Sequence, residues 1–237
     1  MISMESALRV RYTKGQLDDA LSKGLISRDT YDSNIDVANS FDRHKTDVER
    51  MIESGDYVFY RDVDDLKEDY GFGLIDERTY DAVMFLRTSD LEHPIREIDS
   101  VKLRFNLMGL KEGGRYDTFD YIFDPDDRTI SERRYCIHGT LFEGCGNYKA
   151  PDEAHITNLT DDKVDTILRF VSQLCDDGSL EGDHTNAEGF DSVFFDIYVK
   201  TPHGTIHTKG SERFPKFLDS MLLMFHADIW YSHILLS

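Results

Sequence analysis

Two cysteines and two histidines are the residues of this chain best suited to chemistry. Cys136 and His138 lie one residue apart, and Cys145 and His155 follow soon after. Thiolate sulfur and imidazole nitrogen are zinc ligands, and a thiolate beside a histidine base is a nucleophile. The Cys-x2-Cys pair of a zinc knuckle is absent, so the spacing favours a buried thiol and a strand-end imidazole. We therefore expect no metal and no cofactor. An enzyme, hydrolase-like or metal-dependent, with a site around residues 139–155 is the alternative function.

Two acidic clusters offer a different chemistry, which is electrostatic binding. They consist of Asp62, Asp64, Asp65, Glu68 and Asp69, and of Asp176, Asp177, Glu181 and Asp183. Carboxylates at these spacings partly imitate the phosphates of a nucleic-acid strand, and they attract a basic surface. The other interpretation is a solvated face that only keeps the protein soluble. Both interpretations place these side chains on the surface.

The overall charge limits the classes of partner. The chain has 237 residues, 27 of them Lys or Arg and 46 Asp or Glu, which gives a formal charge of −19. Residues 1–90 hold 12 basic and 20 acidic side chains, and residues 91–237 hold 15 and 26, so the acidity is spread along the chain. This charge repels nucleic acid and anionic membranes and favours a basic protein partner. No run of about 20 apolar residues and no secretory signal is found, so we expect a cytoplasmic protein.

An internal repeat organises the first third of the chain. Residues 17–32 read LDDALSKGLISRDTYD and residues 66–81 read LKEDYGFGLIDERTYD, with every match displaced by 49 positions. Each copy has a helix-like segment, a glycine that ends it and a Ser or Asp that caps a second helix. Each copy is therefore predicted to be a helical hairpin.

These segments resemble the short helical hairpins of the SHOCT type that are appended to many bacterial proteins. The resemblance covers about sixteen residues per copy. It implies oligomerisation or docking, so a homo-oligomer formed through the helical region is expected. Two hairpins that simply pack on each other are the alternative interpretation.

The second part of the chain has the period of a sheet. Apolar residues alternate with polar ones over residues 101–107, 119–123, 129–137, 193–199 and 206–208, and residues 160–175 and 214–225 have helical apolar stripes. We expect an α+β protein: a helical hairpin region over residues 1–93, followed over residues 94–237 by an antiparallel five-stranded sheet with two helices on one face.

The order of elements in this second part resembles a small uncharacterised domain that recurs in Gram-positive and gut bacterial proteins. The matching residues are Gly113-Gly114, Pro202 to Gly204, Gly210 and Phe214-Pro215. The resemblance implies a fold and no activity.

Common enzyme signatures are absent from the sequence. It contains no Walker A sequence, no Gly-x-Gly-x-x-Gly after a strand, no Gly-x-Ser-x-Gly and no His-Glu-x-x-His. The sequence therefore favours a non-enzymatic interaction protein of bacterial or phage origin that binds a basic protein. A narrower hypothesis is an inhibitor that mimics nucleic acid and binds a nucleic-acid-binding enzyme, as an anti-CRISPR protein does.

Overall fold

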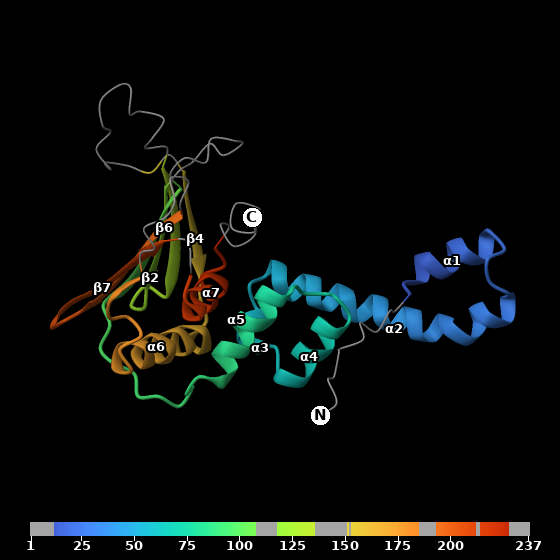
Figure 1. The fold of residues 1–237 in the computed structure, drawn as a ribbon, viewed down its shortest axis with the longest axis horizontal. Coiled ribbons are helices and arrows are strands. Elements are labelled where there is room, and N and C mark those ends of the chain that lie inside the picture. The colour runs from blue at the N-terminus through green and yellow to red at the C-terminus, as the bar shows by residue number, and fades with distance from the viewer. Residues whose placement is uncertain are drawn as a thin grey trace, which may run out of the picture. The chain divides into compact units, whose positions relative to one another are not determined.

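Helices make up the first part of the chain and a sheet dominates the second, which confirms the expected α+β class (Figure 1). This computed structural model describes residues 12–107, 118–135, 151, 153–184, 193–211 and 214–227. The chain divides into a helical unit, Met1–Met84, and a sheet unit, Phe85–Ser237. The division falls earlier in the chain than the boundary expected between residues 93 and 94.

The described part of the helical unit, from residue 12 onward, contains five helices, the last of which continues into the sheet unit. They are α1 (Lys14–Ser22), α2 (Arg28–Glu53), α3 (Tyr57–Tyr60), α4 (Val63–Gly71) and α5 (Glu77–Thr88). A capping box starts α1, because the Thr13 hydroxyl accepts from the Gln16 amide at 3.2 Å and the Gln16 side chain accepts from the Thr13 amide at 2.9 Å. The buried apolar side chains of this unit are Leu17, Ala38, Val48, Tyr57, Val58, Leu66, Ile75, Ala82 and Val83.

Both repeat copies form two helices joined by the same kind of turn. Gly24 and Gly73 have φ values of +67° and +70°, which a residue with a Cβ rarely adopts. The Leu25 amide donates to the Ala20 carbonyl and the Leu74 amide to the Asp69 carbonyl, each at 2.9 Å. These bonds satisfy carbonyls that the helix ends leave free.

The helix that follows each turn is capped in the same way. The Ser27 hydroxyl accepts from the Thr30 amide at 3.1 Å, and the Asp76 carboxylate accepts from the Thr79 amide at 2.7 Å. The two hairpins therefore share a backbone framework.

The sheet unit has seven strands in the order β4-β3-β2-β1-β6-β7-β5. Its elements are β1 (Ser100–Leu107), β2 (Thr118–Asp124), β3 (Thr129–Tyr135), β4 (Glu153–Asn158), α6 (Asp161–Asp176), β5 (Asp183–His184), β6 (Val193–Thr201), β7 (Gly204–Ser211) and α7 (Lys216–Met224). Apolar side chains on one face of the central strands are buried, including Leu103, Phe105 and Ile197. The Phe225 ring, directly after α7, lies 6.2 Å from that of Phe123 in β2. Figure 1 shows α6 and α7 beside the sheet.

The expected five-stranded antiparallel sheet was wrong in two details. The sheet has seven strands, and it is mixed because β5 pairs with β7 in parallel. The additional strands are β4 and β5, which lie at the two edges. Five of the six β4 residues are exposed, so the strand has no buried face to produce an apolar alternation. Strand β5 has two residues, too few to show a period.

Within the described residues, no helix combines the length and the apolar character needed to cross a membrane.

Candidate functional site

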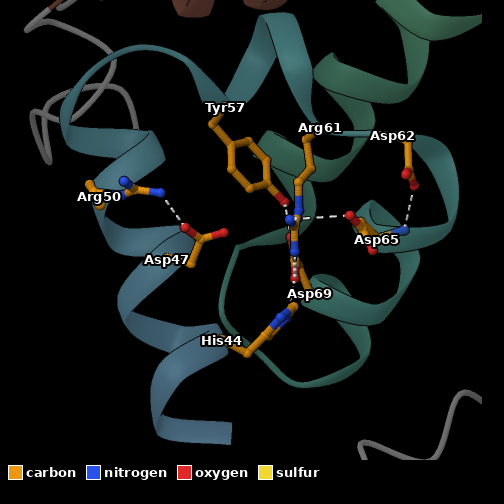
Figure 2. A network of polar contacts seen from close by, with 8 residues as sticks. All are labelled: His44, Asp47, Arg50, Tyr57, Arg61, Asp62, Asp65 and Asp69. Atoms are coloured by element: carbon orange, nitrogen blue, oxygen red, sulfur yellow. Dashed lines mark hydrogen bonds and ion pairs between the residues drawn. The ribbon is translucent and has the colours of Figure 1, made fainter. Parts of the chain in front are cut away.

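A buried carboxylate in the second repeat organises the polar contacts of the helical unit (Figure 2). Asp69 in α4 has no solvent exposure. Its Oδ2 accepts from Arg61 Nε at 2.6 Å and from the Tyr57 hydroxyl at 2.7 Å. Its Oδ1 accepts from Arg61 Nη2 at 2.9 Å and lies 2.6 Å from His44 Nε2. Asp69 therefore ties together α2, α3 and α4.

The protonation pattern of this network follows from its donors. Arg61 binds Asp69 with two charge-assisted hydrogen bonds, which favour the ionised carboxylate. An ionised carboxylate only accepts hydrogen bonds, so His44 donates from Nε2 and a neutral His44 keeps Nδ1 as an acceptor. The hydrogen bond to Asp69 raises the pKa of Arg61. Burial, followed by the hydrogen bond to Asp69, raises the pKa of Tyr57.

His44 also lines a hollow in the surface of the helical unit. The hollow has a volume of about 270 Å³ and is lined by Val37, Ser40, Phe41, His44, Glu68 and Phe72. The rings of Phe41 and Phe72 meet edge to face with centroids 5.6 Å apart, and the Phe72 ring lies 6.1 Å from that of His44. We call this space the Glu68 hollow.

A second hollow shares the same two phenylalanines. It has a volume of about 290 Å³ and is lined by Thr13, Gln16, Phe41, Lys45, Val48, Glu49, Phe72, Gly73 and Leu74. Lys45 and Glu49 form an ion pair of 3.7 Å there. This second hollow, the Lys45 hollow, therefore contains its own cation, whereas none of the described residues that line the Glu68 hollow is a Lys or Arg.

The arrangement suits binding better than acyl transfer. Asp69 orients His44 as a carboxylate orients a catalytic histidine, and Ser40 lines the same hollow. In the part of the chain that the structure describes, however, no hydrogen bond joins Ser40 to His44. The hollow offers instead a carboxylate, a hydroxyl, an imidazole nitrogen and two aromatic rings.

The acidic residues predicted around α4 have different local roles. Asp62 caps α4 by accepting from the Asp65 amide at 2.8 Å, and Asp65 lies 3.2 Å from Arg61. The Asp64 side chain is 97% exposed and lies 3.4 Å from Lys67, and Glu68 is exposed at its hollow. Asp69 was predicted to belong to the acidic surface, but it is fully buried and both of its carboxylate oxygens accept hydrogen bonds. Its place on the predicted acidic surface was wrong.

The acidic residues predicted near α6 are largely engaged by neighbouring groups. Asp176 lies 2.9 Å from both Arg96 and His93, and Asp183 lies 3.1 Å from Lys209. The Asp177 carboxylate accepts from the Ser179 amide at 2.8 Å. Glu181 is exposed.

The thiol and imidazole candidates fall mostly where the structure makes no statement. Cys136, His138 and Cys145 lie outside the described residues. His155 lies in β4, where its Nε2 is 3.2 Å from Glu153 and its side chain is 54% exposed. Among the described residues, no three His, Cys, Asp or Glu side chains come together as a metal site would require.

Sequence reasoning missed His44, Tyr57 and Arg61, although a signal for the network was present. The repeat aligns Asp69 with Ala20, and the preceding leucines, Leu17 and Leu66, are both buried. An acidic residue three positions after a buried leucine of a helix lies on the same inward face, so it needs buried partners.

Two comparisons with known proteins found no match for this chain. No protein-family model matches it, and no curated protein matches it significantly.

Proposed function

We propose that this protein is a non-enzymatic interaction protein whose acidic helical unit binds a basic protein partner. The observation that supports this proposal is the pairing of charges on that unit. Most of its cations are bound by a nearby carboxylate, in the pairs Lys14–Asp18, Lys23–Asp19, Arg28–Asp32, Lys45–Glu49, Arg50–Asp47, Arg61–Asp69 and Lys67–Asp64.

Several of the remaining carboxylates are exposed to solvent. Asp29, Asp36, Glu53, Glu68 and Glu77 are exposed and have no ion-pair partner among the described residues. Such a surface attracts a basic protein and steers its approach. A narrower form of the proposal is an inhibitor that mimics nucleic acid and covers the basic channel of a nucleic-acid-binding enzyme, as anti-CRISPR proteins do. Self-association through the helical region stays a prediction. Light scattering of the intact chain tests it by measuring the oligomeric state.

The experiment has two steps. The full chain captures proteins from a lysate at 0.1 M salt, and each captured protein is identified, purified and titrated with the chain at 0.1 M and 1 M salt. Electrostatic screening falls off over about 10 Å at the lower and about 3 Å at the higher concentration, so the affinity should drop at least about tenfold. The test variant combines Asp29→Asn, Asp36→Asn and Glu77→Gln and should bind more weakly than the wild type at 0.1 M salt. A partner that binds the variant and the wild type equally, at both salt concentrations, contradicts the proposal.

A further inference from the structure

The two repeats place different residues at one pair of helix positions. In the first repeat Asp19 and Lys23 form an ion pair of 2.7 Å. The displacement of 49 residues makes Glu68 and Phe72 their equivalents in the second repeat. The second repeat therefore keeps the acidic residue and replaces the lysine with a phenylalanine.

The backbone places both pairs in the same geometry. The Lys23 amide donates to the Asp19 carbonyl at 3.0 Å, and the Phe72 amide donates to the Glu68 carbonyl at 2.9 Å. Side chains four residues apart on a helix are neighbours, so an ion pair at these positions needs no further adjustment. Phe72 thus lies where the first repeat has a cation, and in the described residues no cation pairs with Glu68.

The lining of the Glu68 hollow suits a cation. Phe41 and Phe72 line it, and an aromatic ring attracts an ammonium or guanidinium group through its negative face. Ser40 and the Nδ1 atom of a neutral His44 are hydrogen-bond acceptors for its N–H groups. The volume of about 270 Å³ is below the range of about 300–1,000 Å³ typical for drug-sized ligands and is suited to a single long side chain.

We infer that the Glu68 hollow receives a lysine or arginine side chain of the basic partner, so that the partner supplies the cation that Lys23 supplies within the first repeat. This inference rests on the proposed function and names its central contact. The cationic head pairs with Glu68 and its aliphatic part packs against Phe72. The Lys45 hollow does not serve in this way, because Lys45 already pairs with Glu49 and repels a second cation.

The inference is tested with the full chain and a fluorescein-labelled peptide of nine lysines at 0.1 M salt, by fluorescence anisotropy. Glu68→Gln should weaken binding about tenfold or more, since it removes a charge-assisted hydrogen bond from the contact. Glu53→Gln is the matched control. It removes the same charge from another exposed glutamate of the acidic surface, one with no ion-pair partner among the described residues. It should weaken binding less than about twofold, because Glu53 contributes only screened long-range attraction.

Two more measurements locate the contact. In wild-type protein the ring-proton signals of Phe72 and His44 should shift as the peptide is added. Phe72→Lys should weaken binding at least as much as Glu68→Gln, because a lysine at this position pairs with Glu68 as Lys23 pairs with Asp19. Circular dichroism checks that the Phe72→Lys variant is folded. If Phe72→Lys unfolds the protein, the test rests on Glu68→Gln and on the ring-proton shifts.

The possible results separate the two claims. Equal weakening by Glu68→Gln and Glu53→Gln, without shifts of the Phe72 and His44 signals, overturns the inference that the Glu68 hollow receives the cation. It leaves the proposal of an acidic binding surface in place. A wild-type protein that does not bind the peptide at all overturns both.

Discussion

The first repeat, residues 17–32, and the second, residues 66–81, have their turn glycines and helix caps at equivalent positions, yet among the described residues only the second contributes a carboxylate to a buried ion pair. Ala20 of the first repeat corresponds to Asp69 of the second, and Lys23 corresponds to Phe72. In the first repeat two acidic residues pair with lysines at the surface, Asp18 with the preceding Lys14 and Asp19 with Lys23. The second repeat binds its buried carboxylate to residues outside the repeat.

This difference shows that the backbone framework of the hairpin stays the same while the contacts made by its side chains change. The framework depends on a positive φ at one glycine and on a few backbone hydrogen bonds, and both repeats have them. The residues between these points are free to differ. In the second repeat they attach the hairpin to α2 and α3 through Asp69, and Glu68 has no cation paired with it in the part of the chain that the structure describes.

The largest expected effect comes from giving the second repeat the residue of the first. Asp69→Ala removes the partner of buried Arg61 and of Tyr57, and breaking a buried ion pair by removing one member costs about 3–5 kcal/mol. We expect the helical unit to unfold at a clearly lower urea concentration. Far-UV circular dichroism and hydrogen exchange of residues 57–71 measure the loss.

Two comparisons test the cause of this loss. Asp18→Ala removes an exposed ion pair of the first repeat and should leave the urea midpoint nearly unchanged. Arg61→Met combined with Asp69→Leu replaces both buried charges with apolar groups and should recover much of the stability. If Asp69→Ala and Asp18→Ala have the same midpoint, the Asp69 network does not stabilise the unit.

The sequence predicted the parts of the fold that have a period. Strand β1 was visible because Val101, Leu103 and Phe105 face the core while Lys102 and Arg104 face away. The two hairpins were visible because their glycines and caps recur at a fixed displacement. The edge strands β4 and β5 were missed because an exposed or very short strand produces no alternation.

The sequence predicted less of the site. It singled out Asp69 for its charge and placed it on the surface with Asp64 and Glu68, although only those two are exposed and Asp69 lies on the buried face of the same helix. Burial depends on which residues pack against a helix face. His44 lies in α2 and Arg61 lies directly after α3, and nothing in the sequence of α4 indicates that these two residues pack against it. The alignment of Asp69 with Ala20 is the signal that a single sequence offers for its position.

Substitutions at the turn glycines, which both repeats share, should lower the stability by equal and moderate amounts. Gly24→Ala and Gly73→Ala each put a Cβ at a φ near +70°, which costs about 1 kcal/mol. An added Cβ at Gly24 meets no atom within 4 Å, so the cost there comes from the backbone alone. Urea unfolding of the two variants should show similar losses, and Asn at either position should lose less than Ala because it tolerates this conformation better. A loss in only one repeat means that the two turns are not equivalent.

The smallest effect is a difference in acid sensitivity. Asp18 accepts hydrogen bonds from Lys14 Nζ and from the Tyr31 hydroxyl, each at 2.6 Å, and these bonds lower the pKa of Asp18. A lowered pKa in the folded state means that this contact stabilises the fold above the ordinary Asp pKa of about 3.9 and is lost as the pH falls through the lower folded value. Carboxyl-carbon NMR should show the Asp18 midpoint below the ordinary value, and Tyr31→Phe should raise it.

The second repeat provides the control for this titration. Its tyrosine, Tyr80, stacks on Tyr70 with centroids 4.7 Å apart, and Lys67 stands at the position of Asp18. Tyr80→Phe should therefore leave the Asp18 midpoint unchanged. If Tyr31→Phe and Tyr80→Phe have the same midpoint, the Tyr31 hydroxyl does not lower the pKa of Asp18. In that case neither tyrosine hydroxyl affects the Asp18 midpoint, and the contrast between the two repeats rests on Asp69 and Phe72 alone.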